Sequence, residues 1–116
     1  MICIISVIEK GDILGEKIKD ILGGDLILKS KIKNFKLDSI TKKCFEKYNS
    51  IIFISSTGIA VRAVSKYLVS KDKDPAVVVV DVCNKFSISL VSGHLGGANN
   101  LTLRVSEILG NIPVIT

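Results

Sequence analysis

The chain alternates between short apolar runs that are typical of buried strands and stretches whose apolar residues recur at helical spacing. Residues 2–8 are almost continuously apolar and rich in Ile, which indicates a strand buried on both faces. The next stretch predicts a helix, which Gly23 and Gly24 can end, with apolar positions at 13, 14, 18, 21 and 22. A short strand over 26–28 follows, and then a helix with apolar positions at 40, 44, 45 and 48. We expect Asp38 or Ser39 to be the N-cap of that second helix.

The second half of the chain continues this alternation. Residues 51–54 form the clearest central strand, and residues 55–58 lead directly into a helix with apolar positions at 60, 63, 64, 67 and 68. Pro75 ends a polar connector, and a buried strand over 76–80 follows it. Residues 83–85 form a turn into a strand over 86–91, so that 76–91 can form a hairpin. Residues 92–100 open a last helix, Gly110 ends it, and a strand begins at 113.

Strands that alternate with amphipathic helices predict the α/β class. We expect a three-layer α/β/α arrangement with a mostly parallel central sheet. A length of 116 residues favours one domain over residues 1–116. The chain stops without a terminal helix or polar tail, so we expect it to be one part of a longer protein.

Composition narrows the class of protein. A hydrophobic content of 47% excludes a disordered chain, and no apolar run approaches the ~20 residues that span a bilayer. The apolar start has no basic residue before it and no small-residue cleavage site after it, so we predict a cytoplasmic protein. Cys3, Cys44 and Cys83 are widely spaced and accompany a single His. They are therefore expected to be reduced thiols, without a protein metal site.

The net charge of +5 indicates a surface that attracts anions. Nucleic acid is not favoured, because the two Tyr and four Phe do not interleave with the lysines as stacking platforms do. The lysines of residues 29–36 are expected to be solvated.

The first candidate site joins the central strand to its helix. In open α/β sheets, ligands bind beyond the carboxyl ends of strands, where helix N-termini point. The hydroxyls and backbone N–H groups of residues 55–58, Thr57 and Gly58 among them, can hold a carboxylate or phosphate there. Ordinary helix capping by Ser56 or Thr57 explains the same residues equally well. Arg62 lies early in this helix and can reach a carboxylate, although a solvated arginine is the commoner case.

The second candidate site is the glycine-rich segment 92–99. Gly93, Gly96 and Gly97 allow the backbone to approach a ligand closely or to hold an anion. His94 is the best candidate for a general acid or base, and Asn99 offers a donor and an acceptor at a helix start. A histidine that merely caps a helix is an equally good explanation. Asp81 is a weaker candidate, because acids at strand ends also stabilise turns.

Several of these segments together resemble the CbiG family of cobalt-precorrin-5A hydrolases. The resemblance is carried by residues 52–54, 57–62, 74–81, 89–99 and 112–116. Its most specific part is the string Gly-His-Leu-Gly-Gly-Ala-Asn at 93–99. It covers residues 51–116 well and residues 1–50 only in pattern, and it implies that this chain is the N-terminal domain of a longer protein.

The resemblance also implies a reaction in anaerobic cobalamin biosynthesis. The δ-lactone of cobalt-precorrin-5A is opened and acetaldehyde leaves, giving cobalt-precorrin-5B. The substrate carries the cobalt, so no further cofactor is expected. On this interpretation His94 is the acid/base, and Gly93, Gly96, Gly97 and Asn99 bind substrate around it.

Three functions are therefore carried forward from the sequence. In the first, the domain is a hydrolase, and Thr57, Gly58 and Arg62 hold peripheral carboxylates of the tetrapyrrole. In the second, it binds the corrinoid intermediate or a partner protein without chemistry. In the third, it is a general anion-binding domain. The expected partners are the tetrapyrrole and other enzymes of the cobalamin pathway, not nucleic acid or a membrane.

Overall fold

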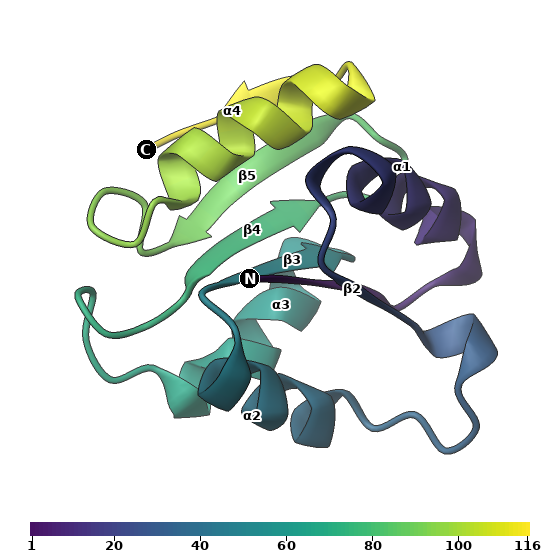
Figure 1. The fold of residues 1–116 in the computed structure, drawn as a ribbon, viewed down its shortest axis with the longest axis horizontal. Coiled ribbons are helices and arrows are strands. Elements are labelled where there is room, and N and C mark those ends of the chain that lie inside the picture. The colour runs from purple at the N-terminus through teal and green to yellow at the C-terminus, as the bar shows by residue number, and fades with distance from the viewer.

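A computed structural model describes all 116 residues and contains one six-stranded sheet, of order β2-β1-β3-β4-β5-β6 (Figure 1). The strands are β1 (Ile2–Ser6), β2 (Asp25–Leu28), β3 (Ser50–Ile54), β4 (Ala76–Val80), β5 (Phe86–Val91) and β6 (Ile112–Val114). The α-helices are α1 (Asp12–Leu22), α2 (Leu37–Lys47), α3 (Thr57–Val64) and α4 (Ala98–Leu109). Three single turns of 3-10 helix are η1 (Glu9–Gly11), η2 (Lys29–Lys31) and η3 (Ser65–Tyr67).

The direction of the strands changes once across the sheet. Strands β2, β1, β3 and β4 are parallel, β5 runs antiparallel to β4, and β6 is parallel to β5. Val80 pairs with Ser87 near the turn, and Val77 pairs with Val91 at the far end of the same ladder. The prediction of a mostly parallel sheet with a hairpin over 76–91 is therefore confirmed.

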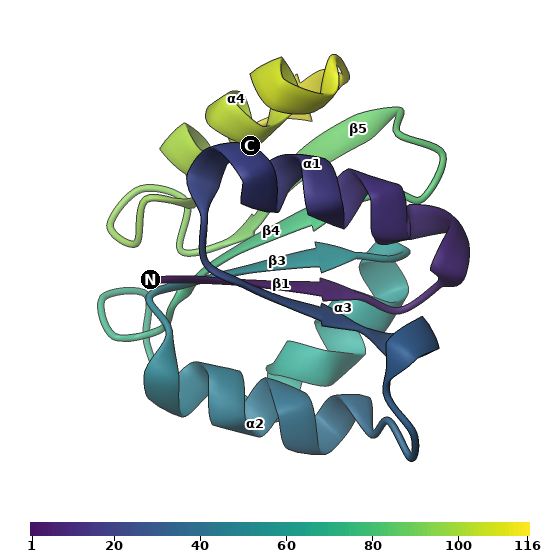
Figure 2. The same cartoon turned by 45° about the vertical axis from the view of Figure 1, so that its right-hand side comes forward.

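Helices cover both faces of the sheet, so the predicted three layers are confirmed. Figure 2 shows α1 and α4 on one side of the sheet and α2 and α3 on the other. Alternate strand residues point to opposite layers. Cys3 and Ile5 belong to the core beneath α2 and α3, whereas Ile4 belongs to the core beneath α1 and α4. None of the helices has the length and apolar character that crossing a bilayer requires.

Two helix starts differ from the sequence-based expectation. Neither Asp38 nor Ser39 caps the second helix, because α2 already begins at Leu37, after Lys36, which makes no side-chain cap. The carboxylate of Asp38 instead accepts a hydrogen bond from Tyr67 and pairs with Lys66. The last helix begins only at Ala98, because residues 92–97 form a loop.

Candidate functional site

The loop between β5 and α4 is anchored at Ser92. This residue is buried and has a φ of 59°, which is uncommon for a residue other than glycine. Its hydroxyl donates to the carbonyl of Asp74 at 3.3 Å, and its own carbonyl accepts from the backbone N–H of Ala98 at 3.1 Å. The loop thus leaves the strand and returns to the helix at nearly the same point.

Gly93 and Asn99 form the second closure of this loop. The N–H of Asn99 donates to the carbonyl of Gly93 at 3.0 Å, and the Asn99 side-chain oxygen accepts from the Ser89 hydroxyl at 2.7 Å. A Cβ atom on Gly93 would lie 2.6 Å from that oxygen, so any other residue there would displace the Asn99 side chain. The amide of Asn99 therefore holds the helix start against β5.

His94 lies at the exposed tip of the loop. Its side chain makes no hydrogen bond or ion pair within the chain, and neighbouring Leu95 is 59% exposed. The backbone N–H groups of Gly96 and Gly97 have no acceptor within the chain. The tip thus combines one free imidazole with two free backbone donors, which suits a ligand bearing a carbonyl or carboxylate oxygen.

The segment from Ser55 to Gly58 caps α3. The Ser56 hydroxyl accepts from the N–H of Ile59 at 3.3 Å, as helix capping predicts. Thr57 is exposed and Gly58 is half-buried. Gly58 lies close to Arg62, because a Cβ atom added there would be 3.1 Å from an Arg62 guanidinium nitrogen. The guanidinium is therefore directed back towards the start of its own helix.

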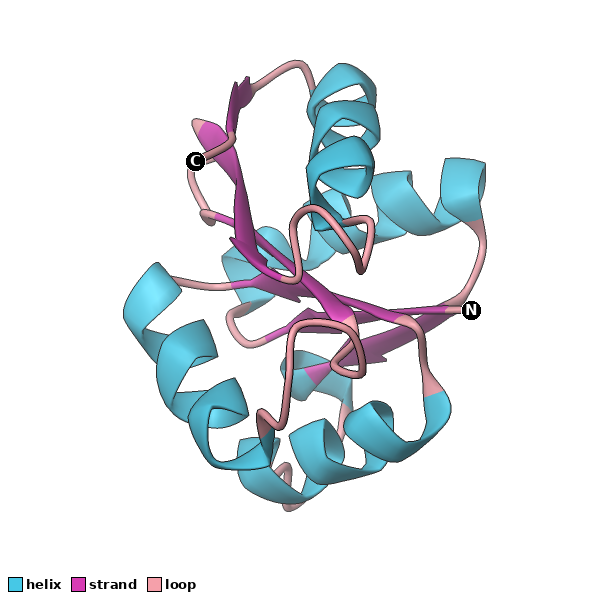
Figure 3. Ribbon diagram, turned by 90° about the vertical axis from the view of Figure 1, so that its left-hand side faces the viewer, coloured by secondary structure: helices cyan, strands magenta, loops and turns pink.

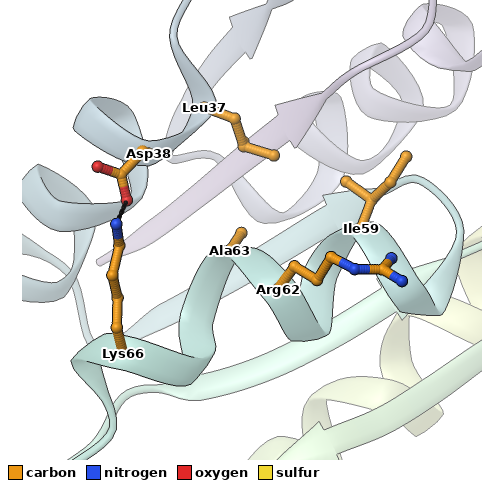
Figure 4. A pocket seen from close by; sticks show the side chains of 6 residues that line it. All are labelled: Leu37, Asp38, Ile59, Arg62, Ala63 and Lys66. Carbon is orange, nitrogen blue, oxygen red and sulfur yellow. Dashed lines mark ion pairs between the residues drawn. The ribbon is translucent and has the colours of Figure 1, made fainter.

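Arg62 also lines a shallow hollow of about 380 Å³ between α2 and α3 (Figure 4). Its apolar walls are Leu37, Ile59 and Ala63, and at its far end Lys66 pairs with Asp38 at 2.8 Å. That pair and the hydroxyl of Tyr67 lower the pKa of Asp38 and raise the pKa of Lys66. Arg62 points away from the pair and has no acidic partner, so it is the free cation of this hollow.

No pattern in the sequence marks Asp38 or Lys66 as part of a site. Asp38 was expected to cap a helix, and the sequence carries no signal for Lys66. No local pattern links the two residues, because Asp38 lies on α2 and Lys66 on η3, and only the tertiary fold brings them together.

The two candidate segments lie at opposite edges of the sheet, although each follows the carboxyl end of its own strand. Residues 55–58 follow the carboxyl end of β3, whereas β5 runs antiparallel and ends beside the start of β4. Figure 3 views the edge where β5 ends, and its loops face the viewer. A five-residue strand separates the edges by roughly 15 Å. One ligand atom therefore cannot contact both segments.

Asp81 acts in the turn and not in an open site. Its carboxylate accepts from the backbone N–H groups of Cys83, Lys85 and Phe86 at 3.1, 2.8 and 2.6 Å. The turn explanation for Asp81 is therefore confirmed. Elsewhere, no three His, Cys, Asp or Glu side chains gather as metal ligands do.

Comparison with known proteins gives a consistent set of relatives. A family model described as "Cobalamin synthesis G N-terminal" matches residues 39–116. A protein of Salmonella typhimurium named cobalt-precorrin-5A hydrolase is 49% identical over 75 residues, which cover 65% of this chain and 21% of that protein. A protein of Priestia megaterium with the same name is also 49% identical, over 72 residues, which cover 62% of this chain and 19% of that protein.

A solved structure extends the likeness to almost the whole chain. A cobalamin biosynthesis protein G homolog from Sulfolobus solfataricus matches with a TM-score of 0.78 and 32% identity, over 99% of this chain and 36% of that one. The chain thus spans about a fifth of the length of the two hydrolases and about a third of the Sulfolobus protein.

Proposed function

The chain belongs to the cobalamin synthesis G N-terminal family, and on this premise we propose that it serves in cobalamin biosynthesis as the N-terminal domain of a cobalt-precorrin-5A hydrolase. The observation that carries the proposal is the loop at 93–99, where the most specific residues of the family resemblance present a free imidazole and free backbone donors. The names of the two 49% identical relatives support the same reaction.

The proposed chemistry at the loop is opening of a lactone. His94 removes a proton from the attacking water and returns a proton to the ring oxygen that leaves the carbonyl carbon. The N–H groups of Gly96 and Gly97 point at the oxygen on which negative charge develops. The exposed side chain of Leu95 lies beside them and offers an apolar contact for the macrocycle. Departure of the two-carbon fragment as acetaldehyde follows ring opening.

Thr57, Gly58 and Arg62 form a separate anion site in this proposal. They lie at the other edge of the sheet, so they hold a peripheral carboxylate and do not contact the lactone that reacts. The unpaired guanidinium of Arg62 in a partly apolar hollow suits an acetate or propionate side chain. A cytoplasmic location is part of the proposal, since all three cysteines are free thiols.

A second function is favoured by the isolation of His94. No carboxylate or hydroxyl orients its ring, and none of the three hollows in the surface includes it. A domain that binds the tetrapyrrole and leaves the chemistry to another part of the hydrolase needs no more than such a loop. This alternative shares the binding site of the first proposal and lacks only its turnover.

The deciding experiment is an anaerobic incubation of this chain with cobalt-precorrin-5A. Acetaldehyde release with the matching loss of macrocycle mass supports the hydrolase function. A changed tetrapyrrole absorbance without acetaldehyde supports the binding function. An unchanged absorbance together with an unchanged macrocycle mass overturns both.

Variants of the loop assign the role of His94. His94→Gln keeps a hydrogen-bonding side chain but cannot transfer a proton at neutral pH, so turnover should fall by about 100-fold or more while tetrapyrrole binding persists. Arg104→Ala changes an exposed residue of α4 outside the loop and is the matched control. Equal turnover in His94→Gln and Arg104→Ala would remove His94 from the mechanism.

A further inference from the structure

Two of the three cysteines form a buried pair that the proposed hydrolase function does not use. Cys3 on β1 is 0% exposed and Cys44 on α2 is 2% exposed, and their sulfur atoms lie 3.2 Å apart within hydrogen-bonding distance. They are 41 residues apart in the sequence, so only the packing of α2 on the sheet brings them together.

A small hollow leads to one member of this pair. It has a volume of about 200 Å³, and its walls include Cys44 but not Cys3. Ile27, Ile40 and Tyr48 line its apolar part, and Lys43 and Lys47 contribute its two cationic side chains. A molecule that enters the hollow therefore meets Cys44 before Cys3, in the presence of two cationic side chains.

We propose that Cys44 and Cys3 form a thiol–disulfide exchange site, in which Cys44 takes up half of an anionic low-molecular-weight disulfide and Cys3 resolves the adduct. The lysines select for a disulfide that carries carboxylates, and the apolar walls accept its aliphatic part. Disulfides in reducing compartments are usually transient and redox-sensing, which fits a reversible pair of this kind.

The electrostatics of the pair assign the two roles. The hydrogen bond shared with Cys3 lowers the pKa of the Cys44 thiol, and Lys47 lowers it further, while burial and Asp25 act in the opposite direction. The same hydrogen bond and burial raise the pKa of Cys3. Cys44 is therefore assigned as the attacking thiolate, since it lines the hollow whereas Cys3 does not, and the thiolate is the nucleophile in exchange.

The two exchange steps balance without any other reactant. The Cys44 thiolate attacks one sulfur of the disulfide, forms a mixed disulfide and releases the first thiolate. Cys3 then loses its proton and attacks the Cys44 sulfur, which forms the Cys3–Cys44 bond and releases the second thiolate. The protein dithiol is oxidised by two electrons, the external disulfide is reduced to two thiols, and the two protons end on these thiols.

The test uses glutathione disulfide as the probe, in a Cys83→Ser background that removes the exposed third thiol. The folded chain is treated anaerobically, then denatured, alkylated and weighed by mass spectrometry. We expect that neither of the two remaining thiols can then be alkylated, because they form a disulfide with each other. No glutathione should stay bound to the chain. If both thiols stay alkylatable in the folded chain and are lost only when the probe is added in urea, the proposal is overturned.

Single variants in the same background separate the two steps. Cys3→Ala should retain one glutathione on Cys44, whereas Cys44→Ala should retain none, and an adduct on Cys3 would contradict the assigned order. Circular dichroism before treatment shows whether each variant is folded. If Cys3→Ala does not fold, a time course on the Cys83→Ser chain still decides, because it should show a transient adduct of one glutathione.

Charge variants test the chemical class of the probe. Lys43→Gln combined with Lys47→Gln should slow the reaction with glutathione disulfide by about 3- to 10-fold. Because Lys47 also lowers the pKa of Cys44, the same pair should slow the reaction with neutral hydroxyethyl disulfide too, but by a smaller factor. Lys42→Gln changes a lysine of the same helix that does not line this hollow, and it is the matched control. Equal slowing with both disulfides would contradict selection by charge.

Discussion

Replacing Gly96 by alanine should displace the loop that presents His94. A Cβ atom at this position would lie 2.4 Å from the Cβ of Ser92 and 2.8 Å from its carbonyl oxygen, both closer than nonbonded atoms approach. Ser92 cannot move aside cheaply, because it is buried and its carbonyl and hydroxyl are both hydrogen-bonded. The overlap must therefore be relieved by movement of the loop itself.

The expected cost follows from this geometry. Gly96 does not lie in the left-handed region, so the substitution adds no strain of that kind, and the overlap alone sets the effect. Overpacking by one methyl group costs about 1–3 kcal/mol. At about 1.4 kcal/mol for each factor of ten, the ratio of folded to unfolded chain should fall by about 5- to 150-fold.

The assay combines urea unfolding with amide hydrogen exchange. Gly96→Ala should lower the free energy of unfolding, and it should also reduce the protection of the Ala98 amide, which donates to Ser92. Gly97→Ala is the control. Its φ of 86° makes an alanine cost about 1–2 kcal/mol, but its methyl group would meet no atom within 4 Å. If Gly96→Ala unfolds within about 0.5 kcal/mol of the parent and keeps Ala98 protected, the reasoning is refuted.

Three further predictions concern the turn, the core and the ion pair. Asp81→Ala leaves three backbone N–H groups without their acceptor, so urea unfolding should show a loss of about 1–3 kcal/mol, and Asp81→Asn, which keeps one acceptor oxygen, should lose less. Phe53→Ala empties a fully buried position and should cost about 3–5 kcal/mol by the same measurement, whereas Ile13→Ala at an exposed position should cost far less. The ion pair with Lys66 lowers the pKa of Asp38, so its stabilisation is present above the ordinary carboxyl value of 3.8 and is lost as pH falls through the lower folded value. Melting temperatures across that acid range should therefore fall less steeply in Asp38→Asn, and an unchanged slope would contradict the assignment.

Much of the fold follows from local patterns in the sequence. Residues 51–54 and 76–80 are apolar at every position, and such runs fit only strands covered on both faces. Because the alternation with helices then requires covering layers on both sides, the three-layer arrangement could be predicted. The start of α2 could not, because the carboxylate of Asp38 is used by Lys66 and Tyr67 of η3, a contact that no local pattern reports.

The position of the second candidate segment follows from the direction of its strand. The rule that ligands bind beyond carboxyl ends applies to parallel strands, whereas the predicted hairpin over 76–91 makes β5 antiparallel to β4. The position of the loop after β5 could therefore be predicted from the sequence. Only a five-residue connection joins β4 to β5, which is too short for a crossover, so β5 must return towards the opposite edge. The roles of His94 and of Thr57, Gly58 and Arg62 stay predictions.

The side chain of Ser92 connects the loop that carries His94 to the connector before β4. Its hydroxyl is bonded to the carbonyl of Asp74, and the Asp74 carboxylate in turn accepts from the N–H of Val69 at 2.9 Å. A glycine would adopt the same backbone with less strain, but it would cut this linkage between the two loops. Serine at this position therefore ties the backbone of the His94 loop to that of the residues before β4.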